Sequence, residues 1–112
     1  MIEITAVMDE TGVLRSCKAA GHAGAGNRGY DIVCAAVSVL MRTAARVLSG
    51  HTGITVRGDA PEAGLLWLET AYTEEGRGFL SSTGDFLLTG LSSVAEEFPA
   101  YCKLTIITER RT

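Results

Sequence analysis

Apolar residues occupy every second position over residues 2–8, at Ile2, Ile4, Ala6 and Met8. Because successive side chains of a β-strand point to opposite faces, this alternation predicts a strand with one buried face. Residues 9–12 (DETG) are typical of a turn, and their number suits a hairpin. A second strand is expected over residues 13–22, with Val13, Cys17 and Ala19 on one side.

The longest segment with helical periodicity predicts a helix from Asp31 to about Ser49. Asp31 suits the N-cap because its carboxylate accepts hydrogen bonds from the free N–H groups that open a helix. Gly50 suits the C-terminal stop. The stripe expected to face the core is Val33, Val37, Leu40, Ala44 and Val47. Ile32, Ala36 and Val39 lie off this stripe, which indicates a helix buried on more than one side, either a central packing element or a subunit contact.

The remainder of the chain predicts two strands, a second helix and a last strand. Ile54 and Val56 indicate a short third strand, residues 59–64 a loop, and residues 65–70 a fourth strand that contains Trp67. A polar segment at 73–78 leads into a helix over about 79–98. The apolar residues of this helix at helical spacing are Leu80, Leu87, Leu91, Val94 and Phe98.

Two glycines, Gly84 and Gly90, are expected to weaken the second helix by about 1 kcal/mol each relative to alanine. Pro99 stops it, and Cys102, Leu104 and Ile106 alternate as the last strand. The order ββαββαβ predicts an α+β fold, a single domain over residues 1–112 with one mostly antiparallel sheet and two helices packed on it.

Composition narrows the functional classes. The chain has 112 residues, a formal net charge of −3 and scattered basic residues, so no basic patch for nucleic acid is expected. No uninterrupted apolar run approaches the roughly 20 residues of a membrane span, and the N-terminus lacks a signal-peptide pattern. Three cysteines give no disulfide framework. We therefore expect a cytoplasmic protein with reduced thiols and no direct contact with nucleic acid or membrane.

The candidate chemistry is concentrated in residues 21–34, GHAGAGNRGYDIVC. His22 ends a strand-like run, a glycine-rich loop follows, and Cys34 is expected in the first turn of the first helix, where the helix dipole favours a thiolate. Steps of four residues from Cys34 lead to Ser38, Arg42 and Arg46, a polar stripe apart from the core stripe. His22 is thus a candidate base for a Cys34 nucleophile. Spacing alone leaves open a capped helix that carries an ordinary thiol.

The positions of the other candidate residues are more typical of structural roles. Cys17 and Cys102 fall among apolar strand neighbours, where cysteines behave as small hydrophobic residues. His51 follows the C-terminus of the first helix, where a cation is favourable. Asp31 is first a cap and second a candidate to orient His22, and Ser38 either supports Cys34 or lies in solvent. No cysteine and histidine set has zinc-site spacing, so no metal site is expected.

The string GHA, a glycine-bearing loop and GYDIVCAAVS resemble the ribosomal-processing cysteine protease family, often called Prp. The resemblance is sharpest over Gly21 to Ser38, and the element order carries it over nearly the full length. It implies a catalytic dyad of His22 and Cys34, with Asp31 and Ser38 at further motif positions. It also implies a substrate loop whose glycines are Gly21, Gly24, Gly26 and Gly29. Residues 24–28 (GAGNR) depart from the bulkier residues of relatives.

The resemblance further implies a small cytoplasmic homodimer without a cofactor, which removes a short N-terminal extension from a large-subunit ribosomal protein precursor. A homodimer is also expected because the helices and strand four, Trp67 included, carry more apolar positions than a lone domain hides. Two alternatives remain at this stage. One is a non-enzymatic ribosome-associated peptide-binding module, and the other is a redox-sensing thiol at Cys34, for which no second cysteine is well placed.

Overall fold

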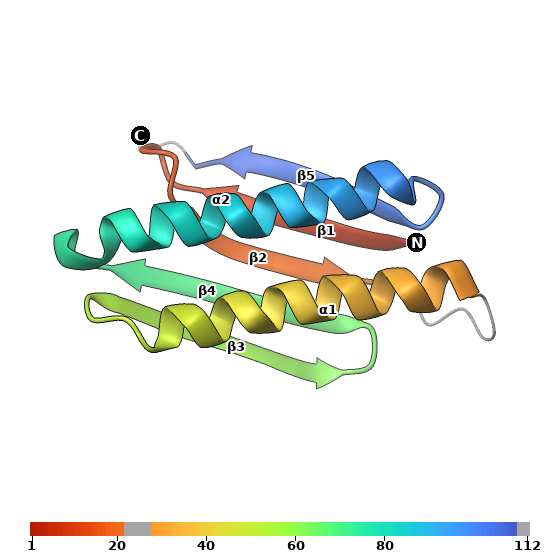
Figure 1. Ribbon diagram of the computed structural model, residues 1–112, viewed down its shortest axis with the longest axis horizontal. Coiled ribbons are helices and arrows are strands. Elements are labelled where there is room, and N and C mark those ends of the chain that lie inside the picture. The colour runs from red at the N-terminus through yellow and green to blue at the C-terminus, as the bar shows by residue number, and fades with distance from the viewer. Residues whose placement is uncertain (22–27, 110–112) are drawn as a thin grey trace.

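The computed structural model describes residues 1–21 and 28–109 as one five-stranded sheet covered on one face by two helices (Figure 1). The elements are β1 (Ile2–Met8), β2 (Leu14–Ala20), α1 (Arg28–Ser49), β3 (Ile54–Glu62), β4 (Leu65–Tyr72), α2 (Glu74–Glu97) and β5 (Cys102–Thr108). The strand order is β3-β4-β2-β1-β5. Within this sheet β1 pairs with β5 in parallel and the other pairs are antiparallel. The predicted α+β class and the ββαββαβ order are confirmed.

The first hairpin forms as predicted, with a correction in β2. Strand β1 occupies the predicted residues, and its alternating side chains from Ile2 to Met8 are buried beneath the helices. The pairing shifts between Val7 and Met8, so that Met8 faces Leu14 while Val7 faces Ser16. This bulge adds one residue to β2 and turns Leu14, in addition to Val13, into the interior. The strand also ends at Ala20 rather than at residue 22.

The loop predicted for residues 59–64 is wrong, because β3 continues to Glu62 and the turn consists of Ala63 and Gly64. Pro61 is compatible with this strand because β3 is the edge of the sheet, and one side of an edge strand has no partner that needs an N–H. The register is irregular between Asp59 and Glu62, on either side of the proline. The β3–β4 hairpin is therefore longer than expected and its turn reaches the end of β2.

Helix α1 begins at Arg28, three residues before the predicted start, so Asp31 lies within the first turn and is not the N-cap. Nothing in the sequence at 28–30 stops a helix, since one glycine costs only about 1 kcal/mol and no proline intervenes. Cys34 is consequently in the second turn. The buried face also differs: Met41 and Leu48 are buried, whereas Val47 is 45% exposed. The predicted helix end at Ser49 is confirmed.

Helix α2 begins at Glu74, five residues before the predicted start. Glu74 and Glu75 occupy its first turn, where the helix dipole favours negative charge, so the polar segment starts the helix and does not only precede it. The glycines that weaken the helix also let it pack closely. A Cβ at Gly84 would lie 3.2 Å from Leu14 Cβ, and one at Gly90 would lie 3.0 Å from Leu40 Cδ2.

The core lies between the sheet and the two helices, which run side by side in opposite directions (Figure 1). By length and apolar composition alone, Asp31–Ser49 would suffice to cross a membrane, contrary to the sequence expectation. In this fold its buried residues Val33, Val37 and Met41 belong to the core cluster with β1 and β2.

Candidate active site

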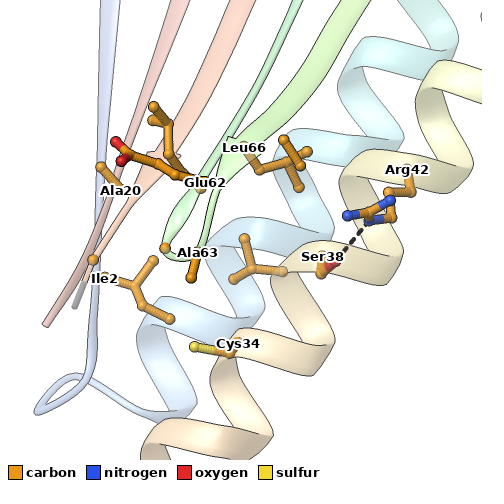
Figure 2. A pocket seen from close by; sticks show the side chains of 14 residues that line it. Ile2, Ala20, Cys34, Ser38, Arg42, Glu62, Ala63 and Leu66 are labelled. Carbon is orange, nitrogen blue, oxygen red and sulfur yellow. Dashed lines mark hydrogen bonds between the residues drawn. The ribbon is translucent and has the colours of Figure 1, made fainter. Parts of the chain in front are cut away.

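A cavity of about 460 Å³ opens where the N-terminal half of α1 meets the ends of β2 and of the β3–β4 hairpin (Figure 2). Its wall on the strand side is largely apolar and includes Ile2, Ala19, Ala20, Ala63, Leu65 and Leu66. Its wall on the helix side is formed by Cys34, Val37, Ser38 and Arg42. The cavity therefore combines an apolar surface with one half-buried thiol and a short polar row.

The polar stripe predicted on α1 lies at this cavity. Cys34, Ser38 and Arg42 are successive residues of the stripe, one helical turn apart, and all three line the wall. In Figure 2 the Cys34 side chain points from α1 toward Ile2 and Ala63. Arg42 reaches back along the helix, and its Nε donates a hydrogen bond of 3.0 Å to Ser38 Oγ. Arg46, the next residue of the stripe, is exposed and does not line the cavity.

The end of β2 is held against the β3–β4 turn. The Gly21 N–H donates to the Gly64 carbonyl oxygen at 2.9 Å, and Gly64 has a positive φ of 82°. A Cβ on Gly64 would overlap the Gly21 carbonyl oxygen, and a Cβ on Gly21 would lie 2.8 Å from the Met1 carbonyl oxygen. This junction requires small residues, and it places Gly21 in the cavity wall with Cys34.

The other predicted site residues differ in how far they can be located. His22, Gly24 and Gly26 lie outside the described residues. Gly29 is part of α1, so it does not belong to a loop. Asp31 is exposed in the first turn of α1 and does not line the cavity. Cys34 and Ser38 are thus the described side chains of the predicted site that the cavity brings together.

His51, the second of two histidines in the chain, lies far from Cys34. It follows the C-terminal end of α1, and the 15 residues from Cys34 to Ser49 span roughly 22 Å of helix. Its ring stacks on Phe79, with centroids 4.2 Å apart, and its Nδ1 lies 2.6 Å from the Thr52 carbonyl oxygen. These contacts agree with the structural role predicted for it.

Cys17 and Cys102 are buried in the sheet, as their strand positions predicted. Burial raises the pKa of the Cys17 thiol to about 12 and also raises the pKa of Cys102. Neither thiol ionises readily near neutral pH. Cys34 is the half-buried cysteine of the three, and no disulfide joins them.

Sequence reasoning missed two parts of this site. Arg42 was placed on the polar stripe without a role, although its spacing from Cys34 already put it on the same helical face. The β3–β4 turn with Glu62 was assigned to a loop, and no local signal linked it to Cys34, because the link depends on the sheet order. Among the described residues, no cluster of three or more His, Cys, Asp or Glu is arranged to hold a metal ion.

Two solved structures illustrate the likeness of this fold to known proteins. SMU.848 from Streptococcus mutans has a TM-score of 0.82 and 29% identity, covering 97% of this chain and 96% of that one. An essential ribosomal processing protease Prp from S. aureus, in complex with a substrate peptide, has a TM-score of 0.80 and 20% identity, covering 95% and 99%. A search of curated proteins gave no match.

A family model described as cysteine protease Prp matches residues 1–103. The matched range contains the cavity, its half-buried cysteine and all elements as far as the start of β5. The chain is therefore a cysteine protease that belongs to the Prp family.

Proposed function

We propose that this protease uses His22 and Cys34 as a catalytic dyad to remove a short N-terminal extension from a large-subunit ribosomal protein. The observation that carries the proposal is the position of Cys34, half-buried in the wall of a cavity that also contains Gly21. Gly21 lines the cavity, and His22, the candidate base, is the next residue of the chain. His51, at the far end of α1, is no candidate for that role.

In the proposed mechanism, His22 accepts the proton of the Cys34 thiol and the thiolate attacks the scissile carbonyl carbon. The C–N bond breaks as His22 returns the proton to the leaving amine. Water then attacks the resulting thioester with His22 again as base, and the acid product and free thiol are released. No metal or cofactor is required for this sequence of steps.

Because of the position of Cys34 in the helix, we expect His22 to contribute most of the activation of the Cys34 thiol. The helix dipole acts mainly within the first turn, and Cys34 lies in the second. The free N–H groups of α1 belong to its first turn, one turn N-terminal to Cys34, and helical side chains tilt in that direction. We therefore infer that the oxyanion of the tetrahedral intermediate is bound by N–H groups that precede Cys34, in the glycine-rich segment or the first turn.

The substrate assignment draws on relatives and on the cavity wall. The Prp protein from S. aureus is a ribosomal processing protease crystallised with a substrate peptide. In the present chain, the apolar strand-side wall is suited to an extended, apolar peptide segment. A ribosomal protein is made in the cytoplasm, and we propose that the protease acts there.

The decisive experiment is incubation of the purified protein with the extended ribosomal protein encoded by the same genome, followed by mass spectrometry of the products. Wild-type protein should release the extension, while Cys34→Ala and His22→Ala should retain the fold and lose cleavage by at least about a thousandfold. Retained turnover in Cys34→Ala would refute the dyad. Peptide binding without cleavage by the wild-type protein would indicate a binding module in place of a protease.

A further inference from the structure

We propose that Arg42 is a specificity residue that binds a side-chain oxygen of the substrate, a carboxylate or a carboxamide, two to four residues from the scissile bond. This inference rests on the proposed function, since it assumes that the peptide lies across Cys34. The guanidinium is the one basic group among the described residues that line the cavity.

The orientation of Arg42 favours this role. Although the residue is exposed, its side chain lies back along α1, where Nε donates to Ser38 Oγ at 3.0 Å (Figure 2). One of the five N–H donors of the guanidinium is used in this bond. The four N–H groups on Nη1 and Nη2 make no hydrogen bond to another described residue. They remain available on the side of the guanidinium away from the helix.

The charge of Arg42 is also unneutralised within the described part of the chain. Glu62 is the acidic residue of the described cavity wall, but it forms no ion pair with Arg42. In Figure 2 the Glu62 carboxylate lies over the strands, near Ala20, and points away from Arg42. An oxygen acceptor of the substrate would therefore meet a guanidinium that has no competing carboxylate partner, and a planar donor pair fits carboxylate and carboxamide oxygens best.

Helix geometry sets the distance from the cut. Arg42 follows Cys34 by eight residues, which is roughly 12 Å along the helix axis. Because the side chain is folded back by about one turn toward Ser38, the guanidinium lies roughly 6–12 Å from the thiol along this axis. An extended peptide advances about 3.3 Å per residue. The contacted side chain is therefore two to four residues away from the reacting carbonyl.

The test uses peptides that cover the N-terminal extension of the cognate ribosomal protein and the first residues after the cut. Positions two, three and four on each side of the scissile bond are replaced singly by Asp, Asn, Ala or Lys. Values of kcat/KM are measured for wild type, Arg42→Gln and Arg46→Gln. Arg46 is the matched control, because it is the next basic residue of the stripe and lies outside the cavity.

At one of the substituted peptide positions, the kcat/KM of wild-type protein should be about tenfold or more higher for Asp or Asn than for Ala and Lys. The difference should arise mainly from KM. Arg42→Gln should abolish that preference by lowering kcat/KM more for the Asp and Asn peptides than for the Ala peptide, and Arg46→Gln should preserve the wild-type preference. The Arg42→Glu variant should reverse the preference in favour of Lys at the same position. The comparison of Asp with Asn separates recognition of charge from recognition of an oxygen acceptor.

Binding of the same peptides to Cys34→Ala, measured calorimetrically, provides a readout that does not require cleavage. If Arg42→Gln lowered affinity and kcat/KM equally for all peptides, or for none of them, the inference would be overturned. The protease assignment would stay intact. Failure of wild-type protein to cut any of the peptides would instead contradict the proposed function.

Discussion

At the scale of single residues, the three cysteines should differ sharply in reactivity. Cys17 and Cys102 are buried and their pKa values are raised, whereas Cys34 borders the cavity. Iodoacetamide at about pH 7.5 should therefore add one label to the native protein, at Cys34, because the thiolate is the reactive form. Peptide mass spectrometry identifies the site. In denaturant all three should be labelled, and native labelling of Cys17 would contradict the described packing.

The same contrast predicts separate effects of serine substitution. Cys17→Ser places a hydroxyl in a buried site, so it should lower the free energy of unfolding by roughly 1–3 kcal/mol if the hydroxyl finds no partner. Specific activity per folded molecule should be unchanged. Cys34→Ser should show the opposite behaviour, with near-normal stability and no turnover. Denaturant titration measures stability and peptide cleavage measures activity. A folded but inactive Cys17→Ser variant would show that Cys17 takes part in catalysis.

The carboxyl group of Asp9 is expected to make the stability of the protein depend on pH. Burial alone would raise the pKa of its carboxyl group, but hydrogen bonds from Thr11, Tyr72 and Val13 outweigh burial and hold the pKa well below its usual range. A folded-state pKa below the unfolded value means that the stabilisation is complete above about pH 5. It is lost as the pH falls below about 4 toward the folded-state pKa.

Asp9→Asn should therefore lower the free energy of unfolding at pH 7 by roughly 1.5–3 kcal/mol and flatten its decline in acid. Urea titrations between pH 3 and pH 7 measure both quantities. Asp85→Asn, on the exposed face of α2, removes one carboxylate outside this cluster and serves as control. If the free energy of unfolding fell equally steeply with pH in Asp9→Asn and in wild type, Asp9 would not be the source of this pH dependence.

At the scale of elements, the sequence was informative wherever burial alone decided the structure. The alternation in β1 and the apolar spacing of α2 were sufficient because each has one buried face. Helix starts were less predictable: α1 begins three residues before Asp31, and α2 begins at Glu74, near the start of the polar segment at 73–78, since the residues that follow do not prevent helical backbone. The β3–β4 hairpin was misread because Pro61 indicates a loop unless the strand is known to lie at the sheet edge.

The junction between β2 and the β3–β4 turn gives a prediction at this scale. Gly64→Ala combines an unfavourable positive φ of 82° with overlap of the Gly21 carbonyl oxygen, so it should displace the end of β2 next to His22. Gly12→Ala is the matched control, because its φ is 85° but no atom lies within 4 Å of the added Cβ. In both variants backbone strain should lower the free energy of unfolding by about 1 kcal/mol.

Activity should separate the two glycine variants. Peptide cleavage should fall in folded Gly64→Ala by more than the change in stability explains, whereas Gly12→Ala should retain wild-type kcat/KM. Circular dichroism confirms the folded state of each. Equal activity of both variants would show that the junction does not position the site.

At the scale of the whole molecule, the fold leaves a row of aliphatic side chains on the outer face of α1. Ile32 and Val39 are 54% and 63% exposed, and Val47, expected in the core, is 45% exposed. Trp67 lies on the opposite face of the sheet, where its cross-strand neighbours are Lys18 and Asp59. The two regions of the predicted dimer contact therefore cannot form one continuous surface, and α1 is the better candidate.

We therefore expect a homodimer that covers this face of α1, because a two-fold contact is the commonest way to bury an apolar patch. Val39→Lys should yield a monomer of unchanged fold, since this side chain is exposed within the single chain. Ile107→Lys is the matched control, as Ile107 is 47% exposed but lies on β5, on the sheet face away from the helices. Light scattering at micromolar concentration gives the mass of each. A monomeric wild-type protein would refute the expectation, and a dimeric Val39→Lys variant would move the contact away from α1.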